Sequence, residues 1–182
     1  MSDPVSALQG AKFDGFASIR EIGPLGMITL RANDLKSLEN AIKAAVGTKL
    51  PTQRRIEIAG NRACGWMSQD EYLLVMPYPE VANALAALAK TLAGTHHLAV
   101  DVSDARAVFR LEGDLATDVL RKLTPVDLDK FAPGELRRSR AAQVAVAFWK
   151  QDGGFTVVCF RSVAGYVMGL LTHSAMPGSE LS

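Results

Sequence analysis

The feature that most constrains the fold of this chain is an internal repeat, in which similar segments recur roughly eighty residues apart. The segment from Met27 to Leu35 resembles the one from Val108 to Leu115, and the segment from Trp66 to Val75 resembles the one from Trp149 to Val158. This spacing exceeds the period of solenoid repeats, which is about 20–50 residues. The repeat therefore predicts a duplicated module with both helices and strands.

Each repeat has the pattern of two strands, a helix, two strands and a second helix. Apolar residues at helical spacing follow Asp34 and Pro79 in the first repeat and Gly113 and Ser162 in the second. Because short turns join the strands, we expect mostly antiparallel sheets with helices packed on one face. The predicted fold class is α+β, with two β-β-α-β-β-α halves. The expected strands are 18–22, 26–32, 62–68, 71–76, 98–102, 107–111, 143–150 and 155–161, and residues 48–61 and 124–140 are expected to be irregular.

The domain organisation follows from this pattern. Residues 1–16 are weakly patterned, so we expect a flexible N-terminal arm. Residues 17–176 are expected to form a single duplicated domain, with halves of about 17–95 and 97–176 that share one core. Residues 177–182 are expected to form a C-terminal tail.

Composition excludes several classes of function. The 182 residues carry 48% hydrophobic side chains and a net charge of +1, which favours neither nucleic acid nor an anionic membrane as a partner. The apolar runs are interrupted by charges, and the N-terminus has no signal-peptide pattern, so we expect a cytoplasmic protein. The two cysteines, Cys64 and Cys159, are expected to be buried free thiols.

The search for reactive groups gives few candidates. Asp101 and Asp104 flank a turn and could act as acid and base, although aspartate is also common in turns, which is the interpretation that we favour. The same two interpretations apply to Asp127 and Asp129. The three histidines show no spacing typical of a zinc site and are expected in a loop and on a helix surface: His96, His97 and His173.

Three further groups also have more than one interpretation. Arg137, Arg138 and Arg140 could bind carboxylates or a phosphate, or lie in a solvated loop. Trp66 and Trp149 occupy matching repeat positions, which favours core packing or a shared edge over a ligand platform. Gly165 and Gly169 are spaced to allow close backbone approach on a helix. We predict no catalytic, cofactor-binding or metal-binding residue, and a protein that works by docking on a partner.

Five short segments carry a resemblance to a known family. They are Trp66–Leu74, Asp101–Arg106, Leu111–Gly113, Pro125–Leu128 and Arg161–Tyr166. In this order and spacing the chain resembles the gamma subunit of heterotetrameric sarcosine oxidase. The part from Asp101 to Leu128 is also similar to glycine-cleavage T-proteins, whose folate-binding domain has a related duplicated fold.

The resemblance implies a non-catalytic gamma subunit that docks on the alpha and beta subunits. In the family, the complex oxidises sarcosine to glycine with production of H2O2, and transfers the one-carbon unit to tetrahydrofolate or releases it as formaldehyde. FAD, FMN, NAD, tetrahydrofolate and zinc are then expected on the partner subunits. The alternative is a stand-alone folate-binding or aminomethyltransferase-like protein. Tyr72 and the sequence Leu123-Thr124-Pro125 depart from the usual family pattern and leave room for a paralogue with a related N-methyl substrate.

Overall fold

The computed structural model describes residues 4–181 and confirms the α+β fold with antiparallel sheets. The chain divides into two compact units. Unit 1 contains the described residues up to Pro24 together with those from Asp104 onward, and unit 2 is Leu25–Ser103. Each unit has its own antiparallel sheet and its own pair of α-helices.

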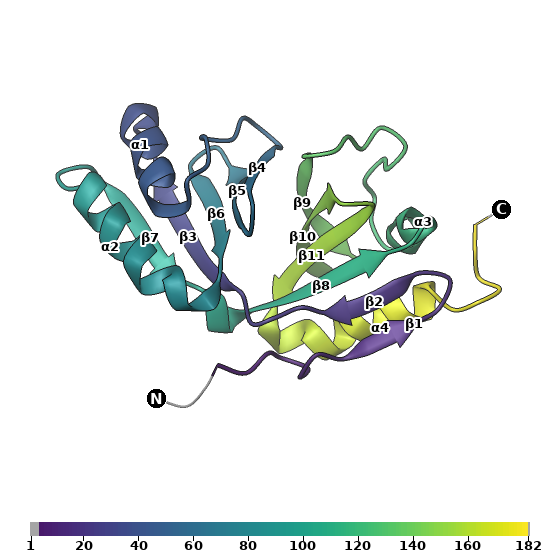
Figure 1. The fold of residues 1–182 in the computed structure, drawn as a ribbon. Helices are drawn as coiled ribbons and strands as arrows, with labels where there is room; N and C mark the ends of the chain where they lie inside the picture. Colours follow the sequence, from purple (N-terminus) through teal and green to yellow (C-terminus); the bar gives the residue numbers. More distant parts are fainter. Residues whose placement is uncertain (1–3, 182) are drawn as a thin grey trace. The chain divides into compact units, whose positions relative to one another are not determined.

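Unit 2 is a five-stranded sheet with the strand order β4-β5-β6-β3-β7. Its helices α1 and α2 lie side by side over one face of that sheet (Figure 1). The elements are β3 (Gly26–Ala32), α1 (Leu35–Val46), β4 (Ile56–Ala59), β5 (Arg62–Ser68), β6 (Glu71–Met76), η1 (Tyr78–Glu80), α2 (Val81–Thr91), β7 (His97–Asp101) and η2 (Ser103–Ala105), the last of which crosses into unit 1.

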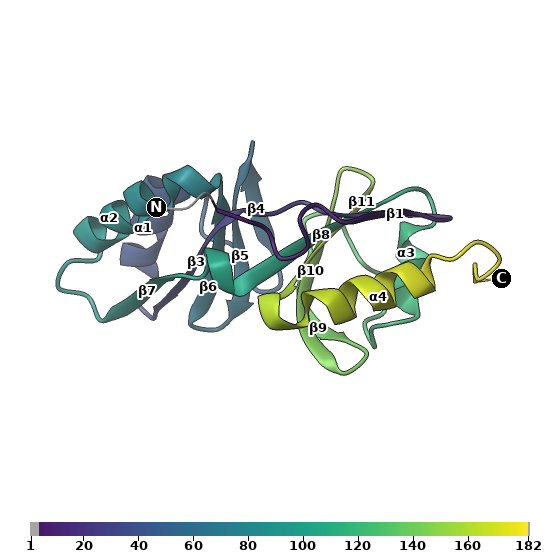
Figure 2. The same ribbon diagram turned by 90° about the horizontal axis from the view of Figure 1, so that it is seen from below.

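Unit 1 is a six-stranded sheet with the strand order β1-β2-β8-β11-β10-β9. The short helix α3 and the longer α4 pack against each other and against β11, and Figure 2 shows α4 along its length. The elements are β1 (Lys12–Asp14), β2 (Ser18–Glu21), β8 (Arg106–Glu112), α3 (Ala116–Arg121), β9 (Leu136–Ala141), β10 (Val144–Gln151), β11 (Gly154–Phe160), η3 (Arg161–Val163) and α4 (Ala164–Ser174).

The first strand of each repeat joins the sheet of the other repeat. Strand β2 pairs with β8, whereas β7 pairs with β3. The two units therefore differ from halves cut at 17–95 and 97–176, because each has exchanged one strand. The hydrophobic period of a strand shows which face is buried, but not which sheet provides the neighbouring strand.

The buried side chains form two clusters, one within each unit, instead of the shared core that the sequence suggested. In unit 1 the rings of Phe131 and Phe148 stack with centroids 5.5 Å apart, and Phe155 packs edge-on against Phe148. In unit 2, Leu38 of α1 and Leu74 of β6 are fully buried. Each cluster includes residues of its unit's helices and sheet, so each unit has a core of its own.

The predicted N-terminal arm is packed on unit 1 in its described part. Strand β1 pairs with β2, and the carboxylate of Glu21 accepts hydrogen bonds from Ser6 Oγ at 2.8 Å and from the backbone N–H groups of Leu8 and Gly10 at 3.0 Å. The side chain of Glu21 is buried, so these donors satisfy a carboxylate that water does not reach freely. Residues 1–3 of the predicted arm and residue 182 of the predicted tail lie outside the described residues.

Two strands arise where the sequence predicted irregular structure. They are β4, which lies within residues 48–61, and β9, which begins within residues 124–140 and ends at Ala141. Both lie at sheet edges. Charged side chains are typical of edge strands, where they discourage pairing with other molecules. Strand β9 contains three arginines, so it lacks the alternating apolar pattern by which a strand is predicted.

Candidate functional site

The predicted acidic candidates have structural partners. Asp101 Oδ1 accepts hydrogen bonds from Ser103 N at 2.9 Å and from Ser103 Oγ at 2.5 Å, which is the geometry of a turn. Asp127 accepts a hydrogen bond from Asp129 N at 3.1 Å and pairs with Lys130, while the carboxylate of Asp129 pairs with Arg121. These contacts agree with the turn interpretation. Asp101 belongs to unit 2, whereas Asp104, Asp127 and Asp129 belong to unit 1.

The histidines lie in two separate places. His96 and His97 line a pocket of about 420 Å³ in unit 2 together with Arg31, Asn33 and Asp70. His97 Nδ1 lies 2.8 Å from Thr95 O. His173 lies on α4 in unit 1. Among residues 4–181, no group of three or more His, Cys, Asp or Glu side chains could hold a metal ion.

The arginine cluster lies on the edge strand β9 and not in a loop. Arg137 forms an ion pair with Glu135 at 2.5 Å and lies over the ring of Phe131, whereas Arg138 and Arg140 are exposed. Alternation along a strand separates Arg137 from the other two, so the three guanidinium groups do not converge on one ligand.

Both cysteine thiols are buried and free, as predicted. Burial raises the pKa of Cys64 far above its usual range, with a further contribution from the charge of Glu57. Burial also raises the pKa of Cys159 to about 11, although the nearby Arg106 opposes the shift. Since the thiolate is the reactive form, both side chains are poor nucleophiles.

Two glycines in α4 have a different role from the expected one. Gly165 and Gly169 lie in the helix, but a Cβ atom added at either position would meet nothing within 4 Å. The predicted close backbone approach is therefore wrong. A close approach does occur at Gly154, where an added Cβ would lie 2.0 Å from the carbonyl oxygen of Leu111.

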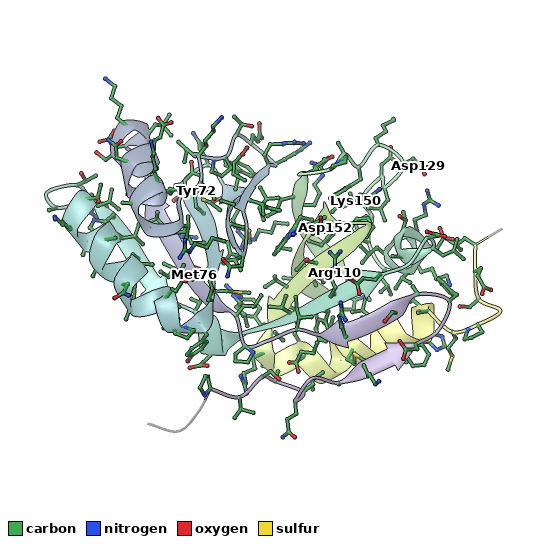
Figure 3. The ribbon with its side chains drawn as sticks, in the orientation of Figure 1. Tyr72, Met76, Arg110, Asp129, Lys150 and Asp152 are labelled. Atoms are coloured by element: carbon green, nitrogen blue, oxygen red, sulfur yellow. The ribbon has the colours of Figure 1, made fainter. Side chains whose placement is uncertain are left out.

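Sequence analysis missed a buried cation, Arg110, which lies on β8 close to the β10–β11 turn (Figure 3). Its Nη2 donates hydrogen bonds to Gln151 O at 2.7 Å and to Asp152 O at 2.9 Å, and its Nε donates to Glu112. Asp152 has a positive φ of 46°, so the guanidinium holds a turn that a non-glycine residue rarely adopts. Arg110 thus stabilises the turn. The signal was an arginine within an apolar strand, at a position on the face opposite the core residues Phe109 and Leu111.

Unit 2 contains a mainly apolar pocket of about 710 Å³, here called the Trp66 pocket. No charged side chain lines it. Its lining residues are Leu35, Leu50, Pro51, Thr52, Gln53, Trp66, Gln69 and Tyr72. Leu35 remains 60% exposed. Apolar pockets of this kind suit a hydrophobic side chain of a partner protein.

Local structure positions the walls of the Trp66 pocket. Asp34 caps α1 by accepting a hydrogen bond from Lys36 N at 3.2 Å, which places Leu35 at the start of the helix. Trp66 on β5 is directly opposite Tyr72 on β6. Burial raises the pKa of Tyr72, with additional contributions from Cys64 and Asp70, so its phenol stays neutral at physiological pH. Trp149, at the matching repeat position, is instead buried. The two tryptophans therefore differ, because Trp66 lines this pocket whereas Trp149 is buried.

No described helix is long and apolar enough to cross a membrane. The sequence profile of the "Sarcosine oxidase, gamma subunit family" matches residues 32–176. The chain is also 31% identical over 156 residues to the sarcosine oxidase subunit gamma of Corynebacterium sp. (strain U-96), in an alignment that covers 80% of this chain and 73% of that protein.

Solved structures show the same relationship. The heterotetrameric sarcosine oxidase from Corynebacterium sp. U-96 in complex with pyrrole 2-carboxylate contains a chain that matches with a TM-score of 0.80 and 25% identity, over 90% of this chain and 87% of that one. The glycine cleavage system aminomethyltransferase T from Bartonella henselae matches with a TM-score of 0.62 and 14% identity, over 83% of this chain and 44% of that one, which shows a shared fold. By its sequence profile and its identity to a curated gamma subunit, this chain belongs to the sarcosine oxidase gamma subunit family.

Proposed function

We propose that this chain is the gamma subunit of a heterotetrameric, flavin-dependent sarcosine oxidase and acts by docking on the larger subunits. The observation that carries the proposal is the match at a TM-score of 0.80 to a chain of a heterotetrameric sarcosine oxidase, which covers 90% of this chain and 87% of its counterpart. A match across nearly all of both chains supports a conserved place in the assembly. The partners are then the alpha and beta subunits.

In this proposal the chemistry takes place on the partner subunits. The complex oxidises sarcosine to glycine, produces H2O2, and transfers the one-carbon unit to tetrahydrofolate or releases it as formaldehyde. FAD, FMN, NAD, tetrahydrofolate and zinc would be bound by the other subunits. The polar clusters described above support this division, because their side chains are engaged in turns and ion pairs within unit 1 or unit 2. That the chain has no catalytic residue of its own, and that the complex is cytoplasmic, stay predictions.

The Trp66 pocket is the described surface that best suits docking on a large subunit. It combines the exposed side chain of Leu35 with the indole of Trp66, and its polar lining consists of uncharged amide and hydroxyl groups. Aromatic side chains in apolar pockets contribute disproportionately to the binding energy of protein interfaces. We infer that an apolar side chain of a large subunit occupies this pocket in the complex.

Co-expression tests the proposal. The chain, carrying an affinity tag, is produced together with the other three subunits of a heterotetrameric sarcosine oxidase from the same genome. The molar mass of the purified material is then measured by light scattering. A complex with one copy of each subunit and a flavin absorption spectrum supports the proposal. A tagged chain that elutes alone, while the other subunits assemble without it, contradicts it.

A variant separates docking at the Trp66 pocket from assembly in general. Trp66→Ala should weaken recovery of the large subunits at least tenfold, since interface hot spots contribute about 2 kcal/mol or more. The matched control is Tyr166→Ala, which removes a half-exposed aromatic side chain from α4 of unit 1. Equal recovery with both variants would place the contact elsewhere and leave the proposed function intact.

A further inference from the structure

One edge of the unit 2 sheet is open. Within residues 4–181, β7 pairs only with β3 and ends the five-stranded sheet. Val102 N donates a hydrogen bond to Met27 O at 2.9 Å, which fixes the alternation of hydrogen bonds along the two strands. Because hydrogen-bonded positions alternate in an antiparallel pair, the backbone N–H and C=O groups of His97, Ala99 and Asp101 point away from β3. They face the open side of the sheet.

The other three sheet edges are protected in ways that β7 is not. Strand β1 has three residues and β4 has four, and β9 carries exposed arginines. Short strands and charged side chains are the usual means of preventing edge-to-edge pairing. Strand β7 instead presents Leu98 and Val100, which are 53% and 41% exposed, and it contains no lysine, arginine or proline. An edge of this kind is suited to pairing with another strand.

The sequence of β7, His-Leu-Ala-Val-Asp, is complementary to itself when two copies run antiparallel about Ala99. Leu98 then lies opposite Val100 of the second copy, and His97 lies opposite Asp101 of the second copy. The outward-pointing residues meet one another as hydrogen-bonded pairs, so this register agrees with the direction of their backbone groups. A two-fold axis through Ala99 gives the same contacts on both sides, as symmetric dimers require.

The polar side chains at the two ends of β7 also suit this arrangement. Both intrachain hydrogen bonds to Asp101 end on Oδ1, so Oδ2 remains for a partner. His97 contacts Thr95 O through Nδ1, which leaves Nε2 for the second copy. Each dimer would contain this histidine–aspartate contact twice, once at each end of the β7 strand pair.

Helix α2 leaves room for the second copy. It packs on both β3 and β7 (Figure 1). Strands lie about 4.8 Å apart, so a helix centred over these two strands lies about 4.8 Å from the two-fold axis, and the two α2 helices would be about 10 Å apart. That separation is at the upper end of the usual interaxial range of about 8–10 Å. Exposed alanines recur on one flank of α2 at positions 82, 86 and 89, which permits such an approach.

We propose that two copies of this chain associate through antiparallel pairing of their β7 edges, so that their two five-stranded sheets become continuous. The inference does not depend on the proposed function. An interface made of one strand pair and the exposed alanines of α2 buries less than the roughly 1,200 Å² of a stable interface. The dimer is therefore weak, with a dissociation constant in the micromolar range, and it forms in the isolated chain at high concentration.

Sedimentation equilibrium of the purified chain, from micromolar to several hundred micromolar, tests the proposal. The wild type should show a reversible monomer–dimer equilibrium. Leu98→Lys, which places a charge on the exposed face of the edge, should raise the dissociation constant at least tenfold. The matched control is Ile58→Lys on the opposite edge strand β4, where the replaced side chain is 39% exposed, and it should leave the equilibrium unchanged.

Two further variants address the backbone contact. Ala99→Pro removes an N–H that points to the open side, so it should abolish the dimer while retaining the pairing with β3. Ala99→Cys should form an intermolecular disulfide on mild oxidation, because hydrogen-bonded pairs have Cα atoms about 5.5 Å apart and disulfides span about 4.4–6.8 Å. Ile58→Cys is its control, and the native thiols are buried.

A monomer throughout the concentration range would overturn the proposal, as would a dimer that Leu98→Lys and Ala99→Pro leave unchanged. Circular dichroism shows whether Ala99→Pro still folds. If it does not, Leu98→Lys and the cross-linking of Ala99→Cys decide the question, because the first changes an exposed side chain and the second is a small substitution.

Discussion

The buried carboxylate of Glu21 should be a major anchor of the N-terminal segment, and Glu21→Ala is the change that tests it. Its oxygens accept hydrogen bonds from Ser6 Oγ, Leu8 N and Gly10 N at 2.8–3.0 Å. Arg161 holds the same segment from outside by donating to Val5 O at 2.9 Å. Loss of Glu21 leaves these donors without their acceptor, while the contact of Arg161 remains.

The magnitude follows from the three hydrogen bonds. A hydrogen bond to a charged group contributes about 1.5–3 kcal/mol. The donors of Leu8 and Gly10 are only partly buried, so water can replace part of the loss. We therefore expect Glu21→Ala to lower the free energy of unfolding of unit 1 by about 2–4 kcal/mol. Glu39→Ala, on the exposed face of α1, is the control and should change stability by about 0.5 kcal/mol or less.

Urea unfolding followed by tryptophan fluorescence measures this change. Trp149 belongs to unit 1 and Trp66 to unit 2, so a Trp66→Phe background reports on unit 1 alone. Amide hydrogen exchange at Leu8 and Gly10 provides a local measurement, and both amides should lose protection in Glu21→Ala. Unchanged protection at these amides, together with a stability change no larger than that of Glu39→Ala, would refute the reasoning.

Two other predictions concern stability. Burial raises the thiol pKa of Cys64 and Cys159 above the usual 9.0, so their stabilising contribution is complete below pH 9.0 and is lost as the pH rises beyond it. Each thiol should then lower the free energy of unfolding by about 1.4 kcal/mol per pH unit. A thiol reagent at pH 8 should label the protein only after unfolding. Gly154→Ala should destabilise unit 1 by more than about 3 kcal/mol or prevent folding, because its added Cβ would meet the carbonyl oxygen of Leu111. Gly165→Ala should stabilise α4 by about 0.5–1 kcal/mol, because its added Cβ would meet no neighbouring atom. Thermal melts of the two variants measure both changes.

Local patterns predicted many of the elements. The hairpin of 62–68 and 71–76 matches β5 and β6, because alternating side chains and a turn are encoded within a short segment. The helix expected after Asp34 is present as α1, and it ends with the C-cap Gly47, which has the left-handed conformation at φ 74°. The helices expected after Gly113 and Ser162 begin slightly later, at Ala116 and Ala164, and no side chain caps the N-terminus of either helix.

Long-range pairing could not be predicted in the same way. Nothing in residues 18–22 or 97–101 indicates that β2 and β7 join the sheet of the other repeat, because both sheets bury similar apolar faces. Strand β9 was not predicted because it is an edge strand that contains Arg137, Arg138 and Arg140, so its alternating apolar pattern is weak. Pairing that spans some eighty residues depends on tertiary contacts, not on local propensity.

The proposed docking surface was the hardest part to predict from the sequence. Trp66 and Trp149 match in the repeat and received one common interpretation, yet Trp149 is buried and Trp66 lines an apolar pocket. The difference arises from residues 50–53 and from Leu35, which line the pocket but lie outside the repeated segment that contains Trp66. The position of a residue in the repeat thus predicts that it lies in a strand and on which face its side chain points, but it does not predict which residues pack against that side chain.

The central claim, that this chain contributes to sarcosine oxidation only as part of an assembly, is tested most directly by measuring H2O2 production from sarcosine. The samples are the isolated chain, the other subunits without it, and the reconstituted complex. We expect no peroxide from the isolated chain and full activity only when the chain is included. Sarcosine-dependent peroxide from the isolated chain, or equal activity of the other subunits with and without it, would contradict the account.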